Sequence, residues 1–260
     1  MYYDKSVLSD QDVTSFEQTL KVCDSKGKEF AMDAGNGYYA SMFMFTGGMT
    51  LGFDEANFSQ ICNYNEQKVT DSLKAFATAI RGSKSFSSMA VTSGVSGMQN
   101  GNVAALIDGT WDAPAIKKAL GSNFGVVKLP TININGQNTQ MVDFLGYRAL
   151  GVNINTKFPA TAHALAAYLS SKDCQEQLAS NLEICPSNIE ALNDSAIASD
   201  PVISAMKEQQ KNSIEQTEIS GCFWDPVASV GSYLYEPDGN PIDDASLKAL
   251  LKDTMSAIEE

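Results

Sequence analysis

Residues that could perform acid–base or metal chemistry are scarce in this sequence. His163 is the only histidine, and it lies in an alanine-rich run for which we expect a helix. Histidine is the usual general base near neutral pH and a common metal ligand, so a single histidine narrows the chemistry that this chain can perform. Because His163 lies in an expected helix, we interpret it as an ordinary helix residue. The sequence also has no Gly-x-Ser-x-Gly elbow that would mark a hydrolytic triad, so it predicts no catalytic residue of this kind.

Five cysteines are a second possible source of chemistry, and their spacing is not that of a metal site. They are Cys23, Cys62, Cys174, Cys185 and Cys222. No two of them form a Cys-x-x-Cys pair. The closest two, Cys174 and Cys185, fit either a disulfide bond or two buried free thiols. The chain also lacks the glycine-rich motifs that cradle phosphates, so we expect no metal ion and no cofactor.

Carboxylates are abundant, and glycoside hydrolysis needs only two of them a few ångströms apart. Candidates for such a pair are Asp108, Asp112 and Asp225. In so acidic a chain, however, most carboxylates are solvated surface groups. We therefore expect a protein that is not an enzyme and keep a glycoside hydrolase as the alternative.

Aromatic residues beside turn residues form a more specific pattern. Three such segments occur, at residues 36–39, 108–112 and 222–226. The only two tryptophans, Trp111 and Trp224, lie in the last two segments, and each is followed by aspartate. Loops at the ends of elements present binding residues, and flat aromatic faces beside polar acceptors suit a sugar. The competing interpretation is that both tryptophans fill the core.

Charge and composition limit the classes of partner. The chain has 18 basic and 31 acidic residues, a formal net charge of −13, and an isoelectric point near 4.5. Such a chain repels phosphate backbones and anionic lipid surfaces, so we expect no nucleic-acid partner. Its 260 residues, of which 43% are hydrophobic, suit one or two ordinary folded domains. No secretion signal opens the chain, and we expect one to have been removed or left out.

The elements that must position these residues alternate between helices and short strands, which favours an α/β fold. Apolar periodicity and capping residues predict helices at residues 66–81, 111–120, 160–169, 172–182, 200–210, from about 225, and at 245–258. Short β-branched runs predict strands at residues 103–108, 125–129 and 149–155. Polar, glycine-rich stretches predict loops at residues 92–102, 133–140 and 236–244.

Several motifs follow one another in a specific order. They are YYDKSVL at residues 2–8, an aromatic-rich helix ending in Gly-Gly at 38–48, GNVAALIDGTW at 101–111, GVVKLP at 125–130, CPSN at 185–188 and FW at 223–224. Their order and spacing resemble the carboxy-terminal two-thirds of the maltose-binding type of extracellular solute-binding protein, the receptor component of ABC sugar importers. Residues 146–155 and the paired helices to residue 182 resemble the crossover between the two lobes of this family.

This resemblance implies an α/β fold of the type II periplasmic-binding-protein class, here as its carboxy-terminal lobe with a small segment of the other lobe. Residues 1–147 and 199–260 would form the carboxy-terminal lobe, and residues 148–198 would belong to the amino-terminal lobe. Most of that amino-terminal lobe has no counterpart in this sequence. The missing lobe of the same protein is therefore an expected partner, because the apolar surface of residues 149–182 would need a cover.

The resemblance also implies a function and a localisation. The family captures a sugar, here a maltodextrin-like oligosaccharide, and delivers it to ABC permease subunits in the membrane. It implies an extracellular or periplasmic protein that is anchored as a lipoprotein in its full-length form. A solute-binding protein for a non-sugar ligand, such as a polyamine, is a second alternative.

The expected site residues follow from the same resemblance. Aromatic residues would stack on sugar rings, and polar residues beside them would bind hydroxyl groups. The aromatic candidates are Tyr38, Tyr39, Trp111 and Trp224, and the polar candidates are Asn36, Asp112 and Asp225. Asn36 and Ala228 stand where maltose binders often have an acidic residue and an arginine, which leaves the identity of the sugar open.

Overall fold

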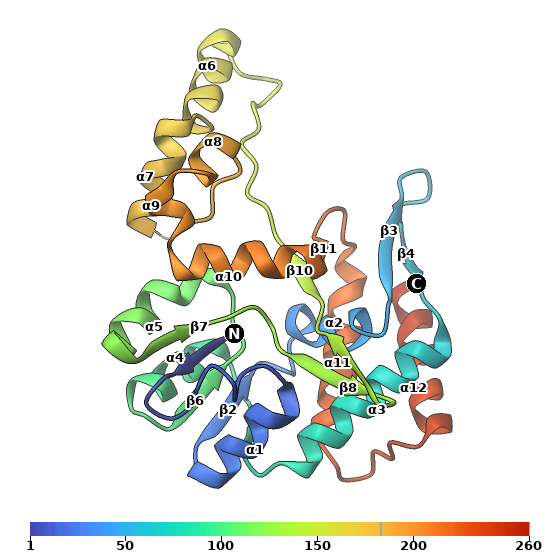
Figure 1. Ribbon diagram of the computed structural model, residues 1–260. Coiled ribbons are helices and arrows are strands. Elements are labelled where there is room, and N and C mark those ends of the chain that lie inside the picture. The colour runs from blue at the N-terminus through green and yellow to red at the C-terminus, as the bar shows by residue number, and fades with distance from the viewer. Residues whose placement is uncertain (183, 260) are drawn as a thin grey trace.

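A five-stranded sheet forms one half of the body in the computed structural model, which describes residues 1–182 and 184–259 (Figure 1). The strand order is β5 (Phe86–Ser88), β2 (Glu29–Met32), β6 (Val103–Leu106), β1 (Tyr2–Asp4) and β7 (Phe124–Val126). Strand β2 runs parallel to both β5 and β6, whereas β1 is antiparallel to β6 and β7. Because side chains alternate across a strand, both faces of this sheet need a cover.

Helices cover both faces of the sheet. Helix α1 (Phe16–Lys26), capped by Ser15, packs on one face, where Phe16 and Phe30 meet edge to face at 5.1 Å. Helices α4 (Val91–Gln99) and α5 (Ala113–Leu120) cover the other face, over a buried cluster that includes Val95, Leu106 and Ile116. The expected α/β arrangement is therefore present.

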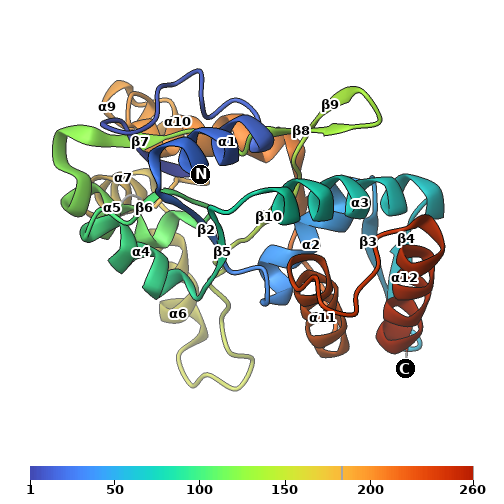
Figure 2. The same ribbon diagram turned by 90° about the horizontal axis from the view of Figure 1, so that it is seen from below.

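A layer of helices forms the other half of the body. It consists of α2 (Gly37–Phe45), α3 (Glu66–Gly82), α11 (Trp224–Tyr235) and α12 (Asp244–Glu259). Figure 2 shows α3 lying across α11 and α12. Phe76 of α3 joins this layer to the sheet side, because its ring lies 4.8 Å from Phe43 of α2 and 5.6 Å from Phe16 of α1. The two halves thus share one continuous core.

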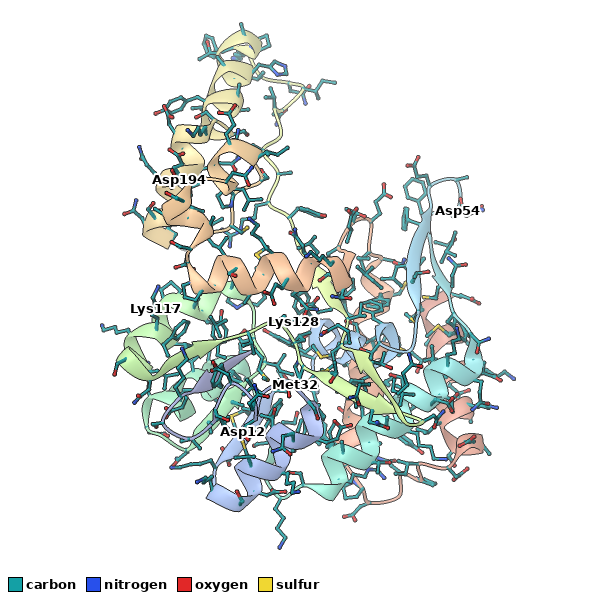
Figure 3. All side chains as sticks on the ribbon, viewed as in Figure 1. Asp12, Met32, Asp54, Lys117, Lys128 and Asp194 are labelled. Carbon is teal, nitrogen blue, oxygen red and sulfur yellow. The ribbon has the colours of Figure 1, made fainter. Side chains whose placement is uncertain are left out.

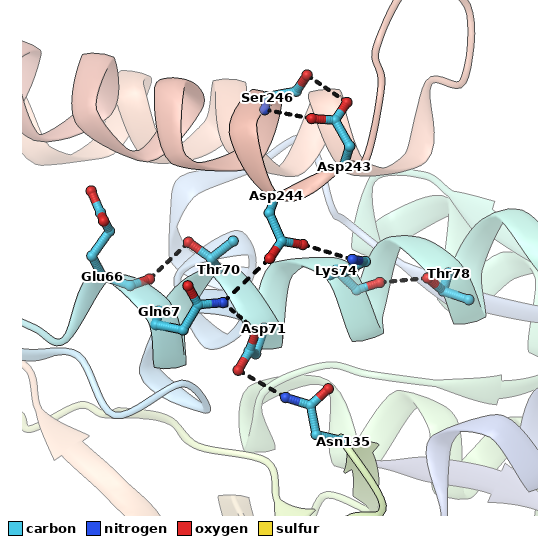
Figure 4. A network of polar contacts seen from close by, with 10 residues as sticks. All are labelled: Glu66, Gln67, Thr70, Asp71, Lys74, Thr78, Asn135, Asp243, Asp244 and Ser246. Atoms are coloured by element: carbon cyan, nitrogen blue, oxygen red, sulfur yellow. Dashed lines mark hydrogen bonds and ion pairs between the residues drawn. The ribbon is translucent and has the colours of Figure 1, made fainter.

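Polar contacts fasten the outer surface of this layer (Figure 4). Lys74 of α3 pairs with Asp244 of α12 at 2.6 Å, and Gln67 also reaches Asp244 at 3.5 Å. Asp71 accepts a hydrogen bond at 2.8 Å from Asn135, in the turn between β8 (Thr131–Ile134) and β9 (Gln137–Gln140). Exposed contacts of this kind each contribute little to the free energy of unfolding. They mainly fix the register of helices that the core already holds together.

A segment of the chain leaves the body and returns to it. Strand β10 (Asp143–Leu145) pairs in parallel with β11 (Ser213–Glu215), and the chain between them protrudes from the body in Figure 1. The protruding part contains α6 (Pro159–Leu169), α7 (Lys172–Leu182), α8 (Ile189–Leu192) and α9 (Ser195–Ala198), and α10 (Pro201–Gln209) brings it back. No residue of α6 is buried, and α7 buries only Ala179 among its described residues. None of the helices in the described residues is long and apolar enough to cross a membrane.

The structure confirms most of the predicted helices and corrects three other expectations. Residues 92–102, expected as a loop, contain α4, because Gly94 and Gly97 let the helix approach the side chains of Leu106 and Val103 on β6. Residues 133–140, also expected as a loop, belong to the β8–β9 hairpin. The strand expected at residues 149–155 does not form, because no described strand pairs with that run. The loop expected at residues 236–244 is confirmed up to Asp244, where α12 begins.

Candidate functional site

Aromatic side chains from four separate elements form a row at one edge of the body. We call this row, consisting of Trp111, Tyr38, Phe144 and Trp224, the aromatic row. Tyr38 lies 6.0 Å from Trp111 and 5.6 Å from Phe144, between ring centres, and Phe144 lies 5.8 Å from Trp224. Trp111 is 52% exposed, Tyr38 and Trp224 are half-buried, and Phe144 is buried. The predicted residues Tyr38, Trp111 and Trp224 are therefore brought together.

Close backbone approaches hold this row in place. A Cβ atom on Gly37 would lie 2.3 Å from the backbone oxygen of Trp224, so only glycine permits the contact between the starts of α2 and α11. At Gly109 an added Cβ atom would lie 2.1 Å from the ring of Trp111. The indole therefore lies directly over this glycine, in the turn between β6 and the short helix η1 (Thr110–Asp112). The turn residues beside the tryptophans thus position their rings.

Phe144 is the member of the row that no sequence motif predicted. It is 5% exposed and also packs against Phe45 at 4.8 Å and Phe223 at 6.1 Å. It supports the row from inside the protein, between Tyr38 and Trp224. Its place on β10 depends on pairing with β11, which lies about seventy residues later in the chain, so no local pattern marks it.

Tyr39 points into the protein and not toward the exposed rings. It is 6% exposed, and its hydroxyl donates a hydrogen bond to Asp108 Oδ1 at 2.8 Å. The same Asp108 oxygen accepts the backbone N–H of Gly109 at 2.7 Å. The expectation that Tyr39 is an alternative stacking residue is therefore not supported by its position, and Tyr38 is the exposed one of the pair.

The three predicted polar residues lie in different surroundings. Asn36 is the N-cap of α2, and its side-chain oxygen accepts the backbone N–H of Tyr38 at 3.0 Å. Asp112 ends η1 directly after Trp111 and lies near the Asp108 carboxyl. Asp225 is exposed in the first turn of α11 and lines a shallow groove with Ser229 and Tyr233. Asp112 and Asp225 thus flank the two tryptophans from separate elements.

Asp108 has an unusual electrostatic environment. The pKa of its carboxyl is raised to about 7, mainly by burial and also by the neighbouring Asp112, whereas hydrogen bonds from Tyr39 and Gly109 oppose the shift. Asp108 Oδ2 is buried and has no hydrogen-bond partner among the described residues. Near neutral pH this carboxyl is therefore partly protonated, so Asp108 can donate a hydrogen bond as well as accept one.

Tyr38 keeps its proton at physiological pH. The pKa of its hydroxyl is raised to about 12, mainly by burial and in smaller part by the nearby Asp143 and Asp108 carboxylates. An uncharged phenol beside flat indole rings and carboxylates offers ring faces for stacking and both donors and acceptors for hydroxyl groups. The arrangement can therefore bind a ligand that has apolar faces and a polar rim.

Comparison with known proteins identifies the family. The model of the family described as bacterial extracellular solute-binding protein matches residues 1–205. A maltooligosaccharide ABC transporter solute-binding lipoprotein of Streptococcus pneumoniae is 30% identical over 134 residues, which are 51% of this chain and 31% of that protein. The chain thus spans about a third of the length of that curated relative.

Solved structures show a similar fold over almost the whole chain. A structure with acarbose is 28% identical, with a TM-score of 0.82, over 99% of this chain and 67% of the other. The maltodextrin binding protein MalE1 from L. casei BL23 is 24% identical, also with a TM-score of 0.82, over 100% of this chain and 68% of the other. These likenesses confirm the α/β fold of the periplasmic-binding-protein class. The chain belongs to the family of bacterial extracellular solute-binding proteins.

Proposed function

We propose that this chain is part of the receptor of an ABC importer and that it captures a maltodextrin-like oligosaccharide. The observation that carries the proposal is the aromatic row, which presents Trp111 and Tyr38 at the surface on a fixed support. Successive sugar rings have apolar faces that stack on such side chains. The names of the relatives support this choice of ligand, because they include a maltooligosaccharide lipoprotein and maltodextrin-binding proteins.

We assign the roles of the site residues as follows. Tyr38, Trp111 and Trp224 stack on sugar rings, while Asp112 and Asp225 accept hydrogen bonds from hydroxyl groups. Asn36 orders the start of α2 through its cap, and its exposed side chain, which also hydrogen-bonds to Asp33, borders the ligand.

The protruding segment supports a two-lobed whole. We propose that residues 1–147 and 199–260 form one lobe and that residues 148–198 belong to a second lobe, most of which is absent from this chain. Large apolar side chains on the segment are exposed, among them Phe158, Leu165 and Tyr168. Their exposure fits a surface that the remaining lobe covers. This lobe would supply the other wall of the cleft, and the closed form would dock on membrane permease subunits.

We further propose that the full-length protein is anchored outside the cell as a lipoprotein, as the name of the pneumococcal relative states for that protein.

Two alternatives bear on the ligand. The family consists of solute-binding receptors and not of enzymes, so the glycoside hydrolase alternative is wrong. A receptor for a cationic solute would use the same fold, and the carboxylates beside Trp111 and Trp224 suit such a ligand. Only a comparison of ligands separates this alternative from the sugar.

The test is a titration of the full-length protein and of this chain with maltotetraose and with spermidine. We expect the full-length protein to bind maltotetraose with a micromolar dissociation constant, about −8 kcal/mol, and to ignore spermidine. Trp111→Ala should weaken binding at least tenfold, whereas Phe58→Ala, which removes an exposed aromatic from the tip of the β3–β4 hairpin (Thr50–Asp54, Ser59–Asn63), should not. This chain alone should bind far more weakly, since half of the cleft is missing. Tight binding of spermidine alone would overturn the assignment of the ligand.

A further inference from the structure

Two cysteines that are 160 residues apart in the sequence lie in segments that meet beside the end of α12. Cys62 is on β4, and Cys222 is in the short helix η4 (Gly221–Phe223), and both elements contact α12. The backbone N–H of Ser220 donates a hydrogen bond to Gln60 Oε1 at 2.9 Å. Residues two apart on a strand share a face, so Cys62 follows Gln60 on the side that faces η4. The residue two after Ser220 is Cys222.

The last turn of α12 contacts the Cys222 thiol and acts electrostatically on the Cys62 thiol. Cys222 Sγ lies 3.1 Å from the backbone oxygen of Ile258. The adjacent Glu259 carboxylate and the Cys222 thiol itself both act electrostatically on the Cys62 thiol. The two thiols therefore lie in segments that meet around the end of α12, and both are free.

The two thiols differ in access. Cys222 is exposed, and its Sγ lies 2.9 Å from Ser220 Oγ. Cys62 is half-buried, and burial raises the pKa of its thiol to about 11. The thiolate is the reactive form, so a reagent in solution meets Cys222 first, and Cys62 can react only with a partner that is already beside it.

We propose that Cys62 and Cys222 form a reversible dithiol–disulfide pair that closes when the chain meets a disulfide oxidant. The Cys222 thiolate attacks one sulfur of the oxidant, breaks its S–S bond and releases one equivalent of thiol. The Cys62 thiolate then attacks the Cys222 sulfur of the mixed disulfide and releases the second thiol. The two cysteines lose two electrons and two protons, and the oxidant takes them up as two thiols. Oxidising surroundings outside the cell, where this family works, favour the closed form.

The bond would fasten a segment that carries a site residue. Cys222 comes two residues before Trp224, so a link to β4 would restrict the turn that presents this indole. A bond between β4 and η4 also closes a long loop of the chain, and such loops lower the entropy of the unfolded state. We expect oxidation to raise the thermal midpoint of unfolding. This inference does not depend on the identity of the ligand.

The test is incubation of the reduced chain with oxidised glutathione, followed by acid quenching, alkylation and peptide mapping. We expect the number of alkylated thiols to fall from five to three, and the protein to become lighter by two hydrogen atoms. The linked peptides should contain Cys62 and Cys222. A glutathione adduct on Cys222 should appear first and then decay.

Variants make the result specific. Cys222→Ser should keep all of its remaining thiols open to alkylation, because the exposed first nucleophile is absent. The double variant Cys174→Ser/Cys185→Ser should still form the bond and show the same rise in the thermal midpoint. A wild-type chain that keeps five alkylated thiols, an adduct on Cys222 that never closes, or a bond between Cys174 and Cys185 instead would each overturn the proposal.

Discussion

Helix α2 in the body of the protein and helix α6 in the protruding segment of residues 148–198 are both strongly apolar, yet they differ in what covers them. Every residue of α2 except Tyr38 is buried, and Phe43 and Phe76 have no exposed surface. In α6 of the segment, by contrast, Leu165 is 56% exposed and Tyr168 is 62% exposed. The apolar character of a helix therefore does not tell what surrounds it, because the partner surface is encoded elsewhere in the chain.

The two regions also differ in what holds each of them in place. The body is continuous through its aromatic core, whereas the segment is held by one short strand pair and by the α10 joint. At this joint the buried Gln209 accepts the backbone N–H of Leu129 at 3.0 Å and donates to the backbone oxygen of Met141 at 3.1 Å. Figure 3 shows Lys117 of α5 below α10, where it pairs with Asp200 at 3.5 Å. We therefore expect mutations in the body to affect global stability far more than those in the segment.

The largest difference should appear between two phenylalanines. Phe76→Ala removes a fully buried ring that contacts Phe16 and Phe43, and we expect a loss of about 3–5 kcal/mol in the free energy of unfolding. Phe158→Ala removes an exposed ring, and we expect a change within about 0.5 kcal/mol. Urea unfolding followed by tryptophan fluorescence measures both, since both tryptophans lie in the body. Similar losses for the two variants would contradict the contrast between the regions.

Two glycines provide the next comparison. At Gly231 of α11 an added Cβ atom would lie 1.8 Å from the backbone oxygen of Ala34, which cannot move aside, whereas at Gly151 nothing lies within 4 Å. We expect Gly231→Ala to cost about 3 kcal/mol through forced separation of α11 from the start of α2. Gly151→Ala, the matched control in the segment, should be neutral or slightly stabilising in the same urea titration. Equal urea midpoints for Gly231→Ala and Gly151→Ala would show that α11 and the start of α2 are not in close contact in solution.

The elements that the sequence predicted well are those whose signals are local. The N-cap Asn65 and the apolar face of α3 lie within the helix itself, and Asn65 accepts the backbone N–H of Lys68 at 3.0 Å. Helices α6 and α7 were equally predictable although almost nothing covers them, because helix propensity acts within each helix. The same local pattern identified Trp111 and Trp224.

The elements that were mispredicted depend on contacts made elsewhere. Glycines made residues 92–102 resemble a loop, but an added Cβ atom at Gly97 would lie 2.4 Å from Val103, so these glycines permit tight packing of α4 on β6. Residues 149–155 have the composition of a strand but no neighbour to pair with. The β8–β9 hairpin is different, because Asn135 and Gly136, both with positive φ, are a local signal for a tight turn.

The pH dependence of stability should depend on Asp108, at the edge of the body next to the aromatic row. Its pKa rises from 3.8 in the unfolded chain to about 7 in the fold, so the folded state binds more protons between these values. Stability from this group is therefore present below pH 4 and is lost as pH rises through 7. Because the carboxyl is partly exposed, solvent screens part of the cost of ionising it in the fold. We therefore expect the free energy of unfolding to fall by about 2 kcal/mol as the pH rises.

The variant Asp108→Asn tests this assignment, since its amide oxygen can still accept the hydrogen bonds of Tyr39 and Gly109. Urea unfolding from pH 4 to pH 8 should show the variant more stable than the wild type only at the upper end. Asp238→Asn, an exposed change in the loop before α12, should follow the wild-type curve. Parallel curves for Asp108→Asn and the wild type would show that this carboxyl is ionised in the fold throughout the range.

The smallest effect should appear at the joint between the two regions, where Asp200 caps α10. Its side chain accepts the backbone N–H groups of Val202 at 2.8 Å and Ile203 at 3.2 Å. We expect Asp200→Ala to lower the free energy of unfolding of the body by about 1 kcal/mol, because α10 packs Val202 into the core beside β7.

Asp194→Ala is the matched change within the segment, since Asp194 caps α9 through a hydrogen bond from Ala196 at 2.9 Å. It should leave the fluorescence-detected unfolding of the body unchanged and should instead speed hydrogen exchange in α9. If both cap variants shift the unfolding of the body equally, the segment and the body unfold as one cooperative unit. If only Asp200→Ala does so, the boundary between the cooperative unit of the body and the separately unfolding segment lies at the start of α10.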